Sequence, residues 1–495
     1  METANMLETP TGPVYGGPDL ETITPAELLL WRRGARKSFA VFCQFMMPDH
    51  TIGAHIDLIR SELQAVGDGK CKRLLLTMPP RHRKSAHASQ LFPCWMLGRN
   101  PKMEIVVAGY AAEIALEHSR KARAFYLSDR FLALFPEVRR PGQSKAGIVQ
   151  TAHEWWTPQR GRYYAVGIGG GLTGRGADLA IFDDPVKDRE EAESERYRNR
   201  AFDWYTSTLG TRLSSGAAIV GIQTRWHVDD LAGRILQNAA EGTGEIYKHI
   251  NLPAIDPTGK TLWPERFSAQ DYAQMRLRAG TRDWEALYQG EPTIQGGNFF
   301  AVDRLRYDAL ADFPEVQYIR CWDPASTEKQ VNKNDPDYTA GALVALTMEQ
   351  GEFGPLPHLW IKDIRAGQWE PNKRNAEIER TAMEDGAAVP IFYEAVGAYK
   401  DSAATMAEAL KGKRMFTPHH VSSDKMVRAS PLQPIFDGGN VHVPRGAAWL
   451  PIFEKQFTEF PAGSHDDVVD AVATARNKLD TPLKTKVISL SGVGR

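Results

Sequence analysis

The most chemically suggestive residues in the first half of the chain form a basic turn after a short apolar run. Residues 72–78, Lys-Arg-Leu-Leu-Leu-Thr-Met, predict a buried strand, and residues 79–85, Pro-Pro-Arg-His-Arg-Lys-Ser, predict a turn that opens a helix. Backbone amides in such a turn, together with the helix N-terminus, favour phosphate. Lys84 could reach the β- and γ-phosphates of a nucleotide, and Ser85 could ligate Mg²⁺. Taken alone, this segment is equally well interpreted as a solvated basic turn.

Two later strand ends could complete a site for nucleotide hydrolysis. An apolar run ends in Asp183 and Asp184, which could hold Mg²⁺ and orient the attacking water. A second run ends at Thr224, which could sense the γ-phosphate, although an ordinary turn also fits. Arg81 could neutralise charge in the transition state, or be a solvated arginine. The residues predicted to contact the nucleotide are Arg81, His82, Arg83, Lys84, Ser85 and Asp183.

Acidic residues gather at predicted element ends in the second half. Asp323 and Glu394 end apolar runs, and Asp466, Asp467 and Asp470 open the last predicted helix. Converging carboxylates repel one another unless cations neutralise them. Two Mg²⁺ or Mn²⁺ ions would do so and would align an attacking water with the leaving oxygen of a phosphodiester. The residue types leave open which of the three helix acids is the third ligand.

The elements that must position these groups form two predicted α/β blocks. In the first, helices precede and separate apolar runs that predict a largely parallel sheet, at residues 72–78, 104–108, 179–182 and 217–221. The glycine-rich residues 167–176 predict a loop. The second block has predicted strands at residues 317–323, 339–346, 358–364 and 389–394, followed by a helix over 465–478.

A length of 495 residues exceeds what one hydrophobic core normally serves, so two domains are expected. We predict a flexible tail over residues 1–24, a nucleotide-hydrolysing domain over 25–290, a linker over 291–312, a second catalytic domain over 313–480 and a flexible tail over 481–495.

The charges balance almost completely, with 60 Lys and Arg against 61 Asp and Glu, so a polyanion would have to bind to local basic patches. Four cysteines lie far apart, without the spacing of a metal knuckle or a disulfide framework, which favours a reducing cytosol. The first 24 residues lack the pattern of a secretion leader, and no apolar run has membrane-spanning length. We therefore expect a soluble protein that is not exported.

The nucleotide motifs together resemble those of tailed-phage terminase large subunits, in both spacing and order. The matching segments are residues 79–85, residues 173–185 and residues 224–231, the last reading Thr-Arg-Trp-His-Val-Asp-Asp-Leu. The resemblance implies that Lys84 and Ser85 belong to Walker A, Asp183 to Walker B, Asp184 to the catalytic acid and Thr224 to the coupling motif. The family usually has glycine where this chain has Arg83. Either the loop tolerates the arginine, with its guanidinium facing phosphate, or ATP binding is damaged.

The second half resembles the RNase H-like nuclease of the same family. The matching phrases are residues 322–325, residues 337–341 and residues 465–470. A segment over residues 423–429 is also similar, and places Lys425 and Arg428 to meet DNA phosphates, with a solvated basic pair as the alternative. The resemblance spans residues 25–478. It implies a P-loop ATPase domain followed by an RNase H-like nuclease domain.

This resemblance implies an ATP-driven translocase that moves double-stranded DNA into a procapsid and cuts concatemeric DNA with Mg²⁺ or Mn²⁺. Its expected partners are the portal protein, a small terminase subunit and further copies of the chain in a ring, commonly of five. We expect it in the host cytoplasm, transiently attached to the procapsid and absent from the mature virion.

Three alternatives share part of this pattern. A helicase-like ATPase would not need the acidic second block, and a transposase or integrase would not need the nucleotide motifs. A degenerate packaging protein that binds DNA or a portal without hydrolysing ATP is kept open by Arg83.

Overall fold

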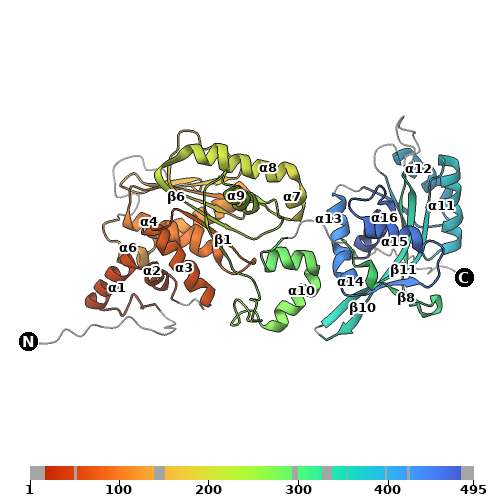
Figure 1. Ribbon diagram of the computed structural model, residues 1–495, viewed down its shortest axis with the longest axis horizontal. Coiled ribbons are helices and arrows are strands. Elements are labelled where there is room, and N and C mark those ends of the chain that lie inside the picture. The colour runs from red at the N-terminus through yellow and green to blue at the C-terminus, as the bar shows by residue number, and fades with distance from the viewer. Residues whose placement is uncertain are drawn as a thin grey trace, which may run out of the picture. The chain divides into compact units, whose positions relative to one another are not determined.

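The computed structural model describes residues 17–48, 53–138, 151–292, 299–325, 337–352, 354–395, 399–420 and 424–480, and the chain divides into two compact units (Figure 1). Unit 1 comprises Met1–Tyr272 and Arg282–Ile294, and unit 2 comprises Ala273–Thr281 and Gln295–Arg495. Residues 273–281, which we expected in the first domain, thus group with unit 2. Leu20 and Ile23, inside the predicted N-terminal tail, pack against the core of unit 1. The predicted C-terminal tail lies outside the described residues.

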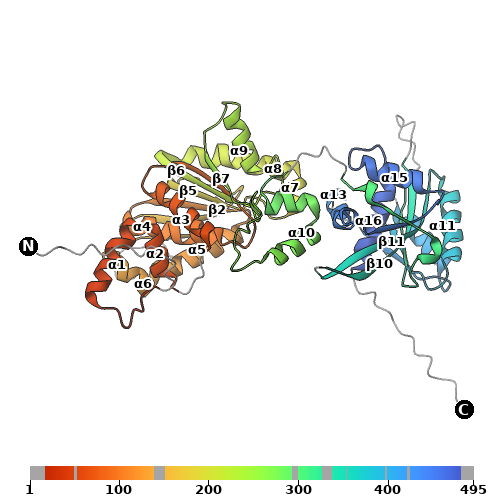
Figure 2. The same cartoon turned by 60° about the horizontal axis from the view of Figure 1, so that its bottom comes forward.

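Unit 1 contains a seven-stranded sheet in the order β3-β4-β2-β5-β6-β1-β7, in which every neighbouring pair is parallel except β3 and β4. The strands are β1 (Arg73–Thr77), β2 (Glu104–Gly109), β3 (Glu154–Trp156), β4 (Arg162–Gly167), β5 (Ala177–Asp183), β6 (Leu213–Gln223) and β7 (Lys248–Asn251). Strands β2, β5 and β6 lie side by side in Figure 2. Because parallel strands share a direction, the carboxyl ends of β1, β5 and β6 meet at one edge of the sheet.

Helices cover both faces of this sheet, since its strands are apolar on both sides. One hydrophobic core joins the sheet to the N-terminal helices, and a second joins it to α8 and α9. The helices are α1 (Pro25–Lys37), α2 (Phe39–Met46), α3 (Ala54–Gly67), α4 (Phe92–Arg99), α5 (Ala112–Leu127), α6 (Asp129–Leu134), α7 (Arg189–Glu193), α8 (Glu195–Asp203) and α9 (Leu231–Ala240); α10 (Ala269–Asp283) is divided, since its residues 273–281 group with unit 2. Short π-helical turns η1 (Ala86–Leu91), η2 (Trp204–Leu209) and η4 (Trp284–Tyr288) and the 3₁₀ turn η3 (Gly210–Arg212) complete the unit.

Local sequence explains where these helices begin. Thr24 accepts a hydrogen bond from the backbone N–H of Glu27, and the Glu27 carboxylate accepts one from the backbone N–H of Thr24. This capping box satisfies two backbone donors that the first turn leaves without helical partners. Asp230 caps α9 similarly, because its side chain accepts from the backbone N–H of Gly233.

Unit 2 contains a mixed seven-stranded sheet in the order β13-β12-β9-β10-β11-β14-β8. The central strands β9, β10 and β11 are antiparallel, and the outer pairs are parallel. The strands are β8 (Arg306–Asp308), β9 (Ile319–Asp323), β10 (Thr339–Gly351), β11 (Gly354–Gly367), β12 (Ile391–Glu394), β13 (Phe416–His419) and β14 (Val441–Pro444). The hairpin of β10 and β11 is longer than the sequence predicted, because pairing continues through polar residues to Gly351 and Gly354.

The helices of unit 2 are α11 (Pro371–Asp385), α12 (Tyr399–Leu410), α13 (Lys425–Ala429), α14 (Gln433–Asp437), α15 (Leu450–Glu459) and α16 (Asp467–Leu479), with 3₁₀ turns η5 (Val302–Arg304), η6 (Leu310–Asp312) and η7 (Ser430–Leu432). Helix α16 packs on β9 and β10, so the start of this helix lies beside the ends of those strands. In neither unit do the described residues include a helix long and apolar enough to cross a membrane.

Candidate active sites

The turn between β1 and the following helix has an unusual backbone. Arg81 and Arg83 have φ of 65° and 63°, in the left-handed region that non-glycine residues avoid. That conformation costs roughly 1–2 kcal/mol per residue. The loop therefore accepts Arg83 while keeping a conformation that suits glycine. Its guanidinium lies over the ring of Trp263, 5.4 Å from the centroid, which differs from our expectation that it faces phosphate. Burial, and then the charge of Arg266, lower the pKa of Arg83.

Lys84 joins the ends of three neighbouring strands. Its ammonium is buried, lies 2.8 Å from Oδ2 of Asp184 and donates a hydrogen bond of 2.5 Å to Oγ1 of Thr224. The other carboxylate oxygen of Asp184 accepts a 2.7 Å hydrogen bond from the backbone N–H of Thr224. The residues predicted to bind phosphate, activate water and sense the γ-phosphate are thus in direct contact.

Asp183 is held at the end of β5 by a set of short contacts. Its carboxylate accepts hydrogen bonds from Oγ of Ser85 at 3.0 Å and from Oγ of Ser89 at 2.6 Å, and lies 3.4 Å from Nε2 of His118. Burial is the largest influence on the pKa of Asp183 and raises it. The nearby His118 lowers this pKa, and the charge of Asp184 raises it further. The contact between Ser85 and Asp183, the two residues predicted to ligate magnesium, is what a shared ion would require.

Sequence reasoning did not identify Ser89 or His118. Ser89 lies one helical turn after Ser85, so its type and spacing carried a usable signal. His118 lies on α5, and only the packing of α5 against η1 brings it to Asp183.

The structure corrects the predicted role of His82. Its side chain is 1% exposed, with Nδ1 2.8 Å from the carbonyl oxygen of Pro80 and Nε2 2.7 Å from the hydroxyl of Tyr272. Burial lowers the pKa of His82 to about 4, so the ring is neutral at physiological pH. His82 packs among the aromatic rings of Trp263, Phe267 and Tyr272, and fixes the loop rather than contacting a nucleotide. Arg81, in contrast, is exposed.

In unit 2, acids from two strands and one helix lie close together. Asp323 ends β9, Glu394 ends the adjacent parallel strand β12, and Asp470 lies in the first turn of α16. Burial raises the pKa of Asp323 well above its ordinary value, and the charges of Asp470, Glu394 and Asp467 raise it further, in that order. Burial also raises the pKa of Glu394.

The acids at the start of α16 differ in their partners. Burial raises the pKa values of Asp467 and Asp470 to about 6. Asp470 is 2.7 Å from a guanidinium nitrogen of Arg428, and its Oδ1 is buried without a hydrogen-bond partner. Asp467 accepts from the backbone N–H of Tyr338 at 3.1 Å.

Asp466 accepts from Nζ of Lys425 at 2.6 Å. Lys425 and Arg428, predicted to meet DNA phosphates, therefore pair with the acids instead. Within the described ranges, no three carboxylate, imidazole or thiolate groups are close enough to ligate one ion. The predicted metal ligands are thus not arranged as a preformed site. The buried, unpartnered Oδ1 of Asp470 and an all-carboxylate donor set nevertheless fit a hard divalent cation such as Mg²⁺.

The two α/β units in succession share the fold of a solved large terminase. Residues 75–307 match the family described as terminase large subunit, T4likevirus-type, N-terminal. This match covers just under half of the chain and supports, over residues 75–307, the resemblance to terminase large subunits predicted from the motifs. A comparison with curated protein sequences gave no significant match.

Solved structures of similar fold include large terminases. The large terminase of a thermophilic bacteriophage, in crystal form 2, has 11% identity and a TM-score of 0.50, with 87% of this chain and 100% of that chain covered. The same large terminase in complex with ATP-γ-S has 11% identity, a TM-score of 0.45 and coverages of 82% and 93%. The large terminase nuclease of the thermophilic phage G20c with bound zinc has 20% identity, a TM-score of 0.25 and coverages of 36% and 97%. The likeness to the first of these structures concerns the fold alone.

Proposed function

We propose that this chain hydrolyses ATP in unit 1 to translocate double-stranded DNA into a procapsid, and cuts concatemeric DNA in unit 2 with a divalent metal. The observation that carries the first activity is the contact of Lys84 with both Asp184 and Thr224. A phosphate-binding cation, a water-activating acid and a sensing hydroxyl at adjacent strand ends are the parts that phosphoryl transfer requires.

In the ATP site, the residues present fit a magnesium nucleotide, which would supply the phosphoryl group for transfer to water. Ser85 and Asp183 would hold the magnesium, and Lys84 would bind the β- and γ-phosphates. Asp184 would orient the attacking water, and exposed Arg81 would stabilise the developing charge. Mg²⁺ is the expected metal here.

Thr224 would couple this chemistry to movement. When Lys84 exchanges its contact with Asp184 and Thr224 for the γ-phosphate, the end of β6 loses a buried hydrogen bond. The next residue, Arg225, donates to Asp230 at 2.8 Å, and Asp230 caps α9. A change at Thr224 would thereby reach α9 through two residues.

In unit 2, we assign Asp323, Glu394 and Asp470 as the metal ligands. Asp470 is preferred to its neighbours because its charge acts most strongly on Asp323, whereas Asp466 is bound by Lys425. Mg²⁺, or Mn²⁺ in its place, would polarise the phosphodiester and bind the attacking water. Arg428 would leave Asp470 for a DNA phosphate when the metal binds.

The test uses purified full-length protein and measures both activities side by side. Asp323→Ala should lose Mn²⁺-dependent plasmid cleavage and keep ATP hydrolysis, whereas Lys84→Ala should lose ATP hydrolysis and keep plasmid cleavage. Asp466→Asn is the matched control, because Asp466 is an acid of the same region that is not assigned as a metal ligand. Loss of both activities in either variant, or of neither, contradicts the two-site assignment.

A second candidate function rests on the left-handed conformation of Arg83, with φ of 63°. If the strain and bulk of this arginine prevent nucleotide binding, the chain is a packaging-associated protein that binds DNA or the portal without hydrolysing ATP. Absence of turnover in the native protein, with turnover appearing in Arg83→Gly, would favour this candidate.

The match of residues 75–307 to the terminase large-subunit family supports the proposed partners: double-stranded DNA, the portal protein, a small terminase subunit and a ring of further copies, commonly five. We place the protein in the host cytoplasm, on the procapsid only during packaging. Co-sedimentation with isolated procapsids in the presence of an ATP analogue would test this attachment.

A further inference from the structure

The glycine-rich loop of residues 167–176 lies along α8 and the turns that follow it. A β-carbon at Gly169, whose φ is 86°, would lie 2.3 Å from Nε of Arg200. The indole N–H of Trp204 donates to the carbonyl oxygen of Gly170 at 2.9 Å. Glycine is therefore required where the loop approaches the helix, and the two form one surface.

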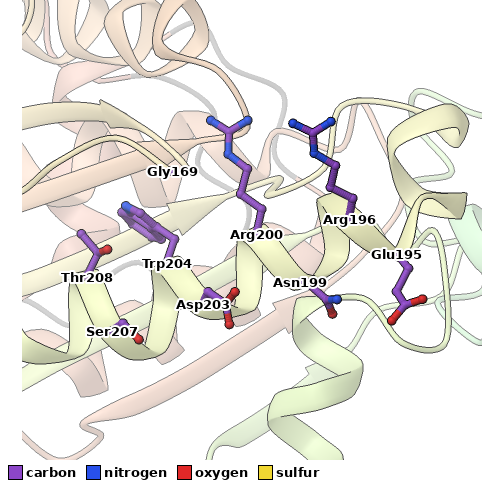
Figure 3. Close-up of a pocket in the computed structure, with 9 residues that line it drawn as sticks. All are labelled: Gly169, Glu195, Arg196, Asn199, Arg200, Asp203, Trp204, Ser207 and Thr208. Atoms are coloured by element: carbon purple, nitrogen blue, oxygen red, sulfur yellow. The ribbon is translucent and has the colours of Figure 1, made fainter.

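This surface contains an open groove of about 740 Å³ on α8 and η2, shown in Figure 3. Its polar lining includes Arg196, Asn199, Arg200, Ser207 and Thr208. Arg196 and Arg200 are exposed, lie one helical turn apart and extend to the same side of α8. Among the residues that the structure describes, neither pairs with an acid; Arg200 donates only to the carbonyl oxygen of Ile168, at 3.1 Å.

The arginine between them, Arg198, differs from Arg196 and Arg200 because it does pair with an acid. Arg198 donates to Asp229 at 3.0 Å and to the carbonyl oxygens of Ala192 and Glu193. It therefore fastens α8 to the residues before α9. Alternate arginines of the segment Arg-Tyr-Arg-Asn-Arg thus have different roles: Arg198 is structural, whereas Arg196 and Arg200 are exposed and pair with no acid among the described residues.

Two acids also line the groove, and among the described residues neither forms an ion pair with Arg196 or Arg200. Glu195 and Asp203 act on Arg234 of α9, whose pKa is raised first by its hydrogen bond to Asp229 and then by the charges of Asp229, Asp203 and Glu195. In Figure 3, Glu195 points away from the two arginine side chains. The cationic side of the groove faces the glycine-rich loop.

We infer that this groove binds the phosphate backbone of duplex DNA during translocation, an inference that rests on the proposed function. Guanidinium, hydroxyl and amide groups are the usual donors to DNA phosphates. The exposed glycines Gly171 and Gly174 have open space around their Cα atoms, so a phosphate can approach their backbone. Two cations on one helix face complement a duplex that carries roughly one negative charge per 1.7 Å of its axis. No base-reading geometry is needed for a motor that moves any sequence.

The test is binding of a fluorescent duplex of mixed sequence by full-length protein, measured by anisotropy over a range of salt concentrations. The Arg196→Gln/Arg200→Gln variant should bind more weakly, and its plot of log affinity against log salt should be shallower by about 2, one for each lost phosphate contact. Arg196→Gln alone should lower the slope by about 1, and it tests the inference without disturbing the contact of Arg200 with the loop.

The matched control is Arg33→Gln, which removes an exposed arginine from α1 and should leave affinity and slope unchanged. Wild-type affinity and slope in the double variant, with wild-type ATP hydrolysis intact, would overturn this inference and leave the proposed function standing. Unchanged DNA binding combined with weaker self-association in sedimentation would assign the groove to a second copy of the chain, and would also overturn it. Failure of the wild-type protein to bind duplex DNA at all would count against the proposed function itself.

Discussion

Replacing Asp470 by asparagine should stabilise unit 2 at neutral pH when divalent cations are removed. Burial raises the pKa of Asp470 from 3.8 to about 6 despite the nearby Arg428. The folded protein therefore holds this proton more tightly than the unfolded chain does. The free energy of unfolding consequently falls as pH rises from about 3.8 through about 6, and the loss is complete above that range.

The size of the effect follows from the same pKa values. Each pKa unit corresponds to about 1.4 kcal/mol, so ionised Asp470 lowers the stability of unit 2 by about 3 kcal/mol at pH 7. Asparagine cannot ionise, and its carbonyl oxygen can still accept a hydrogen bond from Arg428. Asp470→Asn should therefore gain about 3 kcal/mol at pH 7 and almost nothing near pH 4.

The assay is urea unfolding in EDTA. Hydrogen exchange of peptides from β9 and α16 is the signal, so that unit 2 is observed separately. Asp466→Asn is the control, because its partially exposed pair with Lys425 should contribute no more than about 1 kcal/mol. A lower stability of Asp470→Asn at pH 7, or an equal gain at both pH values, would refute the reasoning. Added Mn²⁺ should stabilise the native protein and not Asp470→Asn.

Three further substitutions test unit 1. Arg83→Gly removes about 1–2 kcal/mol of backbone strain, but it also gives the unfolded chain more conformational freedom and loses the contact with Trp263. The free energy of unfolding in urea should therefore change by about 1 kcal/mol or less. A larger loss of stability would contradict this balance. Thr224→Val should keep the affinity for an ATP analogue and slow DNA-stimulated hydrolysis by at least about tenfold, whereas equal loss of binding would argue against a coupling role. Tyr272→Phe leaves Nε2 of buried His82 without its hydrogen-bond partner and should lower stability by about 1–3 kcal/mol without changing KM for ATP; a raised KM would restore His82 to the nucleotide contacts.

The sequence predicted the positions of the strand ends well, because each depends on a local pattern. An apolar run that stops at a polar residue marks the end of a buried strand, and Asp183, Asp323 and Glu394 each end a strand in the structure. Thr224 follows directly after β6. The order of elements also predicted parallel neighbouring strands in unit 1. The carboxyl ends of β1, β5 and β6 were therefore expected at one edge of the sheet, as the structure shows.

The orientation of individual side chains could not be predicted in the same way. His82 has the residue type and position of a phosphate contact, but α10 brings Tyr272 to its ring and fixes it away from the loop surface. The pairing of Arg428 with Asp470 similarly depends on the packing of α13 against α16. These contacts join residues far apart in the chain, and no spacing in the sequence records them.

The ion pair of Arg428 and Asp470 leads to a last prediction about metal affinity. The ionised carboxylate of Asp470 is largely buried, so removing Arg428 leaves that charge without its partner and should destabilise unit 2 in EDTA by about 3 kcal/mol or more at pH 7. The same change should strengthen metal binding, because the ion no longer competes with a guanidinium for Asp470. For Arg428→Ala, we therefore expect a lower melting temperature in EDTA together with a lower Mn²⁺ concentration at half-maximal thermal stabilisation. Lys425→Ala, which frees Asp466 instead, should leave that concentration unchanged. If Arg428→Ala weakens metal binding, the arginine supports the metal site directly, and its displacement cannot be part of cleavage.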